Sequence, residues 1–424
     1  MKKKSSSDKP TLISPLSDFF KQESASGIVI IIAAILGLVW ANSTFSSSYF
    51  SILDTYFKFE FASFLFKMNI AHFINDGLMT IFFFLVGLEI KREVTIGHLS
   101  SRKKFMVPLF AAIGGMAIPA LIYLAIAGSI EPRGWAIPIA TDIALALGIL
   151  GLVQARTAPT LRPFLLGLAV IDDIGAILII AVFFSTGLNF SWLLAALLAV
   201  LLTLTVKYFN VRFTIVYVII GFFLWYSFYK SGVHPTIAGV ILGLIAPITP
   251  FISPNFIDTD ELANVSSVKH AMKTKKIAKN SVSIVEWLEH VIHPWSAFVI
   301  VPIFAWANAG IEITSKTFGI VFSSKVAWAI MLGLVVGKPV GVLIFSKIAK
   351  SSGLGQLPAK TSWAQLWATG KSAGIGFTVA IFIAKLAFSD LEMQSLAIIS
   401  VLIASVVSGL ISIAIFRISK PSRR

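Results

Sequence analysis

Two adjacent aspartates, Asp172 and Asp173, stand in the middle of an otherwise uncharged apolar run from Phe164 to Phe184. The run is long enough for a helix that crosses a bilayer. One carboxylate near the centre of such a helix costs ~2.5–3.5 kcal/mol to insert, so the pair costs roughly 5–7 kcal/mol by simple addition. Ionisable residues at such depth mark ion or proton pathways. The pair therefore indicates a site for a cation or a proton.

Three further polar residues in apolar segments could complete such a site. Thr141 and Asp142 follow Pro138, and proline frees a backbone carbonyl that a polar side chain or an ion must satisfy. The alternative is a kinked helix that these two side chains merely cap. Lys338 also lies within an apolar run. A purely structural ion pair with Lys338 can explain only one of the two aspartates, because neighbouring helix positions point ~100° apart.

The composition indicates a polytopic membrane protein. The chain has 424 residues, of which 57% are hydrophobic and 13% charged, and its mean hydropathy is +0.88. Soluble domains carry about 25% charged residues. There is no cysteine, which excludes disulfides, iron–sulfur clusters and thiolate metal sites. The net charge of +15 follows from basic loops, so we expect no nucleic-acid binding.

Apolar runs of roughly 17–25 residues predict twelve membrane-spanning helices. An even number puts both ends of the chain on one side, and Lys and Arg are concentrated in the loops on that side, which predicts that both termini are cytoplasmic. The centres of the runs lie near Ala33, Phe83, Met116, Ala144, Gly175, Leu197, Ile219, Ile241, Ile303, Leu334, Thr378 and Ser405.

Four segments follow from these spans. We expect a cytoplasmic N-terminal tail over residues 1–24, a single membrane transporter domain over 25–417, a cytoplasmic loop at about 250–280 within it, and a cytoplasmic tail over 418–424. After the loop, apolar positions from Ile284 to Trp295 recur at helical spacing and predict an amphipathic helix. Residues 57–61 alternate with period two and predict a short strand, or a hairpin, outside the membrane.

Gly374 and Gly376 interrupt the eleventh apolar run, as Thr141 and Asp142 interrupt the fourth. Spans 3–5 and spans 10–12 thus each have an interrupted middle member, which is typical of inverted-topology repeats with a binding site at the midplane. The expected fold class is an all-α polytopic membrane protein with twelve transmembrane helices and two interrupted crossing helices.

A series of motifs, in the same order from about residue 15 to 415, resembles the NhaA-type sodium/proton antiporter family. The motifs are Asn75–Met79, Val86–Glu93, Ala140–Ala144, Val170–Gly175, Leu288–Trp295, Phe304–Gly310, Gly337–Pro339 and Gly374–Thr378. Two features depart from the family pattern, namely the length of the loop at about 250–280 and Lys371, which stands where an apolar residue is expected.

The resemblance implies that Asp172 and Asp173 bind sodium and protons, with Thr141 and Asp142 at the crossing of the broken helices and Lys338 paired with Asp172. It further implies that Asp76 and Asn75 lie along the cytoplasmic funnel. A pH-responsive cytoplasmic cluster would hold Glu89, Arg92, Glu93, Glu289, His290 and Val291, and His234 would respond to pH elsewhere. No cofactor is implied beyond the transported Na+, Li+ and H+. The expected partners are membrane lipid and, through the family likeness of the extramembrane strand, a second copy of the chain.

The residue types suit electrogenic antiport, in which sodium (or lithium) leaves the cell while a larger number of protons enters by alternating access, for sodium and pH homeostasis. Sodium is a hard cation that takes oxygen ligands, and protons compete for the same carboxylates. We expect Asp172, paired with lysine, to be the proton-linked group and Asp173 to be the sodium ligand.

Two functions other than antiport are alternatives. An ion-coupled symporter of an organic anion on the same fold would need a basic side chain near the midplane, and Lys371 is the candidate. An intramembrane aspartyl protease would need aspartates on separate helices with one in a Gly-Asp motif, whereas Asp172 follows Ile171 and Asp142 follows Thr141. We therefore expect a transporter and not an enzyme.

Overall fold

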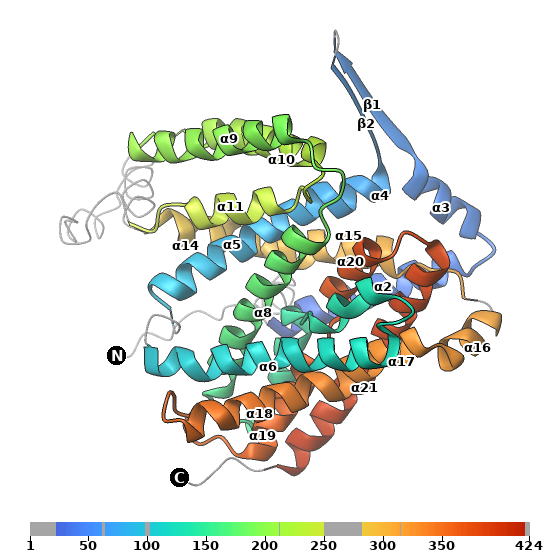
Figure 1. The fold of residues 1–424 in the computed structure, drawn as a ribbon, viewed down its shortest axis with the longest axis vertical. Coiled ribbons are helices and arrows are strands. Elements are labelled where there is room, and N and C mark those ends of the chain that lie inside the picture. The colour runs from blue at the N-terminus through green and yellow to red at the C-terminus, as the bar shows by residue number, and fades with distance from the viewer. Residues whose placement is uncertain are drawn as a thin grey trace, which may run out of the picture.

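The computed structural model describes residues 23–61, 64–97, 102–211, 213–249, 282–313 and 315–419. Most of these residues are helical, and one hairpin projects from the helical body (Figure 1). The predicted tail over 1–24, apart from its last two residues, the predicted loop at about 250–280 and residues 420–424 of the predicted C-terminal tail lie outside the described residues.

The first half of the described chain contains α2 (Glu23–Ala41), α3 (Ser46–Asp54), α4 (Ile70–His72), α5 (Met79–Thr95), α6 (Arg102–Ala127), α7 (Ile143–Leu152), α8 (Leu161–Phe183), α9 (Phe190–Tyr208), α10 (Thr214–Ser231) and α11 (Ile237–Ile245). The second half contains α14 (Ile284–Trp295), α15 (Val301–Ala309), α16 (Ser315–Ser323), α17 (Lys325–Leu332), α18 (Lys338–Ser351), α19 (Trp363–Ala373), α20 (Phe377–Ala387) and α21 (Leu391–Ile418).

Several membrane-length helices are continuous through a wider, π-helical turn. Such turns join α4 to α5 at Phe73–Leu78, α14 to α15 at Ser296–Ile300, and α17 to α18 at Gly333–Gly337. A π turn inserts an extra residue into the helical ladder and is frequent at functional sites. The turn at Gly333–Gly337 ends immediately before Lys338, one of the predicted site residues.

Nine helices of the described chain are long and apolar enough to cross a membrane, or up to eleven if each of two bent pairs is one span. These nine helices and two bent pairs coincide with eleven of the twelve predicted centres. The count of twelve is not confirmed, because the remaining centre, Ile241, lies on the nine-residue α11. A helix of that length rises ~14 Å, about half the hydrocarbon thickness.

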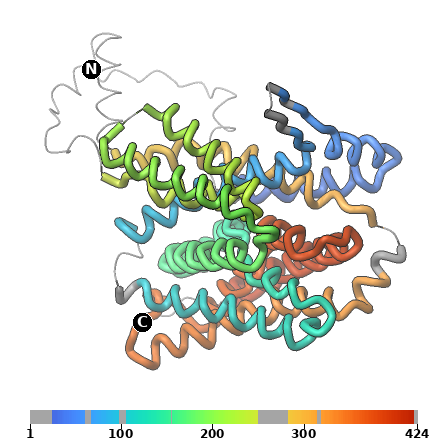
Figure 2. Tube along the Cα trace, turned by 45° about the horizontal axis from the view of Figure 1, so that its top comes forward, coloured from blue at the N-terminus to red at the C-terminus, as the bar shows by residue number. Residues whose placement is uncertain are grey.

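The helix α8 passes through the middle of the molecule, between α5 on one side and α6 on the other (Figures 1 and 2). On the far side of α8 from α5, α6 lies against α18. The two backbones approach so closely that a Cβ on Gly341 would stand 2.0 Å from the carbonyl oxygen of Gly114. Glycine at this crossing therefore sets how near α18, and with it Lys338, comes to the centre.

The predicted strand is confirmed and belongs to a hairpin. Strands β1 (Tyr56–Phe61) and β2 (Phe64–Asn69) pair antiparallel, with Lys58 opposite Lys67. The hairpin points away from the helices (Figure 1). It leads through α4 and the following π turn directly into α5.

Both predicted interruptions are present. A 3-10 helix over Pro132–Ile139 gives way to extended backbone at Ala140, and α7 starts afresh at Ile143 with Asp142 as its N-cap. In the second interrupted run, α19 ends at Ala373, and α20 continues from Phe377 at an angle of 48°. Each break exposes helix-end amides and carbonyls that need partners within a buried interior.

Candidate ion-binding site

The two interrupted runs meet at Asp142. Its backbone N–H donates to the carbonyl of Ile375 at 2.6 Å, and its carboxylate accepts from the backbone N–H and the hydroxyl of Thr378 at 3.1 and 2.6 Å. The same carboxylate caps α7 by accepting from the N–H of Leu145 at 3.1 Å. One negative charge therefore serves the positive N-terminal ends of both α7 and α20, an arrangement that stabilises each helix end.

Asp172 lies next to this crossing and is fully buried. The ammonium of Lys338 is 2.9 Å from Oδ2 of Asp172 and also donates to the backbone carbonyl of Ile139, at the end of the 3-10 helix. The hydroxyl of Thr141 lies 2.8 Å from the same Oδ2 and 3.0 Å from the carbonyl oxygen of Ala373. The Lys338–Asp172 pair thus joins α18 and α8 to both broken segments.

Asp173 points in a different direction from its neighbour. It lines a cavity of about 760 Å³, together with Thr141, Asp142 and Thr378 from the crossing, whereas Asp172 is not among the lining residues. The Oδ1 atom of Asp172 has no hydrogen-bond partner among the described residues. Of the two neighbouring aspartates on α8, only Asp173 therefore faces the cavity, and the lysine-paired Asp172 lies behind it.

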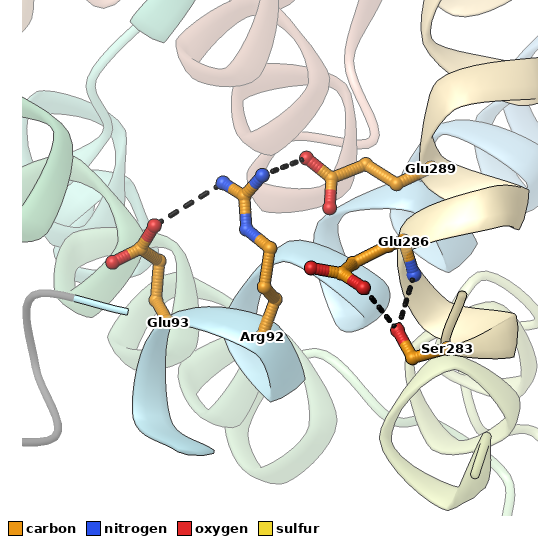
Figure 3. A network of polar contacts seen from close by, with 5 residues as sticks. All are labelled: Arg92, Glu93, Ser283, Glu286 and Glu289. Atoms are coloured by element: carbon orange, nitrogen blue, oxygen red, sulfur yellow. Dashed lines mark hydrogen bonds and ion pairs between the residues drawn. The ribbon is translucent and has the colours of Figure 1, made fainter. Parts of the chain in front are cut away.

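An ion-pair network forms part of the wall of this cavity, away from the crossing (Figure 3). Arg92 near the end of α5 contacts Glu93 at 3.1 Å and Glu289 of α14 at 2.7 Å. Ser283 is the N-cap of α14: its hydroxyl oxygen accepts from the N–H of Glu286, and its hydroxyl donates to the Glu286 carboxylate at 2.9 Å. Glu89 also lines the cavity. One cavity thus extends from the contact between α5 and α14 to the aspartates of the crossing.

The sequence was compared with protein families and with curated proteins. The family model described as Na+/H+ antiporter 1 matches residues 17–416. Three curated relatives are named as Na+/H+ antiporters. The relative from Pelagibacter ubique is 44% identical over 381 residues, which cover 89% of this chain and 90% of the relative. One from Clostridium beijerinckii is 41% identical over 408 residues, covering 96% of both chains, and one from Myxococcus xanthus is 40% identical over 418 residues, covering 95% and 89%.

The chain belongs to the Na+/H+ antiporter 1 family. It is a multi-pass membrane protein, and the NhaA likeness seen in its motifs is confirmed. The curated names support antiport, and they give no support to the organic-anion symporter.

In this antiporter, the structure brings five of the predicted residues together at the crossing, namely Thr141, Asp142, Asp172, Asp173 and Lys338. Gly374 and Gly376 form the break of the α19–α20 segment beside them. Glu89, Arg92, Glu93 and Glu289 form a second group at the cavity wall. His290 and Val291 follow Glu289 on α14 but are exposed.

Asn75 and Asp76 lie elsewhere, in the π turn that precedes α5. Residues 76 and 89 are separated by ~20 Å of rise at 1.5 Å per residue. Asp76 faces His234, whose Nε2 is 3.6 Å from Asp76 Oδ1 and whose Nδ1 lies 2.8 Å from the hydroxyl of Thr236. These residues stand at the opposite end of the span from Arg92, and the expected place of Asn75 and Asp76 in a cytoplasmic funnel stays a prediction.

Thr378 is a polar side chain of the crossing that is absent from the predicted site residues, although it ends one of the quoted motifs. We expect Thr378→Val to lower the melting temperature of the purified antiporter in detergent. The variant keeps the shape of the side chain but removes the hydroxyl that donates to Asp142 at 2.6 Å, and a hydrogen bond to a charged group contributes ~1.5–3 kcal/mol. Thr378→Ser is the matched control and should melt like the wild type. Equal melting temperatures for all three proteins would contradict this role.

Proposed function

We propose that the chain exchanges Na+, and Li+, for protons at the crossing of its two broken segments. Sodium/proton antiport is the activity in the names of its relatives. The observation that carries the assignment of the site is the pair of unlike carboxylates on α8: Asp173 faces the cavity, and Asp172 is held by Lys338 behind it.

The chemistry follows from the oxygens gathered there. Asp173 and the hydroxyls of Thr141 and Thr378 face the same cavity. These are the hard oxygen donors that an alkali cation prefers, and a proton competes with that cation for the carboxylate. Lys338 balances the charge of Asp172, and the ends of α7 and α20 balance that of Asp142, so the site is close to neutral when Asp173 has bound either a proton or a sodium ion. If only such a neutralised site changes its side of access readily, competition becomes exchange.

The direction of exchange follows from topology. We assign the Arg92 end of α5 to the cytoplasm because the loop from Lys91 to Lys104 is rich in basic residues. The cavity would then be the cytoplasmic approach to Asp173, and the hairpin β1–β2 and the Asp76–His234 contact would lie on the outer side. Protons entering from an acidic exterior would drive sodium out. Exchange at Asp173 alone would be one proton for one sodium ion, so the additional proton of electrogenic exchange would be carried by Asp172, which would leave its pairing with Lys338 when it is protonated.

The full architecture is part of the same proposal. Twelve spans, with both termini in the cytoplasm of a cell inner membrane, agree with the distribution of basic residues. Spans 3–5 would be α6, the broken run ending in α7, and α8; spans 10–12 would be α17–α18, the broken pair α19–α20, and α21. An inverted repeat is supported because each set has a broken member between two unbroken ones.

Regulation and partners complete the proposal. The Arg92–Glu93–Glu289 network, with Glu89, would respond to pH at the cytoplasmic end of the cavity, and His234 would respond at the other end. Helices α9 and α10 expose apolar side chains such as Leu197 and Ile219 and would face lipid. A second copy of the chain would contact the hairpin.

Reconstituted vesicles test the proposal directly. With an acid interior imposed, external Na+ or Li+ should collapse the pH gradient, whereas K+ or choline should not. Clamping the membrane potential at zero should speed the collapse, because unequal numbers of charges cross. A pH gradient that collapses only when an organic anion accompanies sodium would instead favour the symporter, and a gradient indifferent to sodium would refute the proposal.

A further inference from the structure

Lys371 is a buried cation that the exchange reaction described above does not use. It stands in the last turn of α19, just before the break at Gly374, and is 6% exposed. Its ammonium donates to the backbone carbonyl of Val335 at 2.5 Å and lies 5.4 Å from the centre of the Trp367 ring. Within the described residues, no carboxylate forms an ion pair with it. Its specific partner is therefore a main-chain oxygen on a neighbouring helix.

The carbonyl of Val335 lies where the hydrogen-bond ladder of its own helix is irregular. In an α-helix this carbonyl would accept from the N–H four residues later, at position 339. That residue is Pro339, which has no N–H. Val335 also lies within the π turn Gly333–Gly337, where the ladder of hydrogen bonds is already shifted, as the N–H of Lys338 donates to the carbonyl of Gly333. An unmet carbonyl at this depth would be costly.

The π turn determines where the side chain of Lys338 points, because Lys338 is the residue at which α-helical geometry resumes. From there its ammonium reaches Asp172 and the carbonyl of Ile139. A change in the turn by one hydrogen bond would rotate Lys338 relative to α8. Residues that fix the turn therefore fix the partner of Asp172.

The contact between α19 and this turn is close enough to transmit such an effect. A Cβ on Gly374 would stand 2.5 Å from the carbonyl oxygen of Leu334, and a Cβ on Gly370 would stand 2.9 Å from Cα of Pro339. Lys371 lies between these two glycines on α19. Its hydrogen bond thus crosses an interface at which the two backbones are already in contact. The π turn can therefore move very little as long as this hydrogen bond is present.

We infer that Lys371 is a positioning residue for the transport site: its ammonium holds the Val335 carbonyl of the π turn and so keeps Lys338 aimed at Asp172. The inference rests on the exchange site proposed above. The physical basis of the effect is preorganisation. A site whose charged groups are already held in place binds its ion more tightly than a site that must order these groups on binding. Lys371 does not touch the cavity, so the maximal rate is expected to change less than the affinity.

The test compares four variants with the wild-type antiporter in vesicles and in detergent. Lys371→Met removes the donor, and the apparent KM for Na+ should rise about tenfold. A change of this size in KM is expected when a hydrogen bond to a charged group is lost. The maximal rate should change less. Lys371→Arg and Lys371→Gln both retain a donor and should restore most of the affinity. Lys350→Met is the matched control, because Lys350 also lies over a tryptophan ring of α19, at 5.5 Å from Trp363, but is exposed.

A coupling experiment separates positioning from a general loss of structure. Stabilisation by Na+, read as the rise in melting temperature when Na+ replaces choline, can be measured even in variants that do not transport. Lys371→Met should reduce this rise in the wild-type background but hardly change it in a Lys338→Met background, because residues that act through one another are not additive. An unchanged KM in Lys371→Met, or equal effects in both backgrounds, would overturn the inference. If the wild type itself showed no sodium-dependent flux, the proposed function would fail instead.

Discussion

Asp173→Asn should abolish sodium-dependent proton flux in vesicles, and Asp172→Asn should abolish it as well. Asparagine has the shape of aspartate but can neither release a proton nor offer a charged ligand. Asp173 is the carboxylate that faces the cavity, and Asp172 is the one that Lys338 holds at 2.9 Å. Flux in either variant is expected to equal that of protein-free vesicles. Asp54→Asn, at an exposed aspartate at the end of α3, should retain wild-type flux.

The two variants should nevertheless differ in how they bind sodium. If Asp173 is the sodium ligand, Asp173→Asn loses the rise in melting temperature that Na+ produces. Asp172→Asn keeps much of that rise, because its cavity-facing carboxylate is intact. Sodium-dependent flux in both variants would refute the site. The reverse pattern of sodium binding would keep the site and exchange the roles of the two aspartates.

Hydropathy and residue type predicted much of this fold. Long apolar runs must become helices in a bilayer, since every backbone group needs a partner within its own segment. The same rule made the breaks visible, because Pro138 with Asp142, and Gly374 with Gly376, are poor choices within a buried continuous helix. The hairpin was visible through the period of two in residues 57–61.

Other features were not readable from the sequence. The nine-residue α11 is as apolar as a full span, so composition does not show how short this helix is, and the twelfth crossing at Ile241 stays a prediction. The donors and acceptors at the crossing include the main-chain carbonyls of Ile139, Ala373 and Ile375, and main-chain groups carry no residue-type signal. Asp76 stands at the other end of the span from Arg92, a separation that residue type alone does not show.

Lys338→Met should produce the largest loss of stability of any single substitution at the site. It leaves the fully buried Asp172 without its ammonium partner and leaves the Ile139 carbonyl without a donor. Removing one member of a buried ion pair costs roughly 3–5 kcal/mol, because the remaining charge stays buried and uncompensated. A marked fall in melting temperature in detergent is the expected readout. Lys350→Met, at an exposed lysine on the same helix, should melt like the wild type.

The stability lost in Lys338→Met should increase with pH. A buried carboxyl without a partner is tolerated as the neutral acid, so folding of Lys338→Met takes up a proton that folding of the wild type does not need. The stability difference between wild type and variant should therefore grow as pH rises above the range where unfolded aspartate titrates. Melting curves at several pH values would measure it, and a difference that shrinks towards alkaline pH would contradict the ion pair.

Removing both partners should restore much of the stability that removing one destroys. In Lys338→Met with Asp172→Asn, no buried charge is left unpaired, and replacing both members of such a pair is often close to neutral. The double variant should thus melt well above Lys338→Met and yet carry no sodium-dependent proton flux. That outcome would separate the two roles of the pair, because the interior tolerates its absence while exchange does not. A double variant as unstable as Lys338→Met would instead mean that the lysine is needed for the Ile139 carbonyl and the broken helix, whatever the state of Asp172.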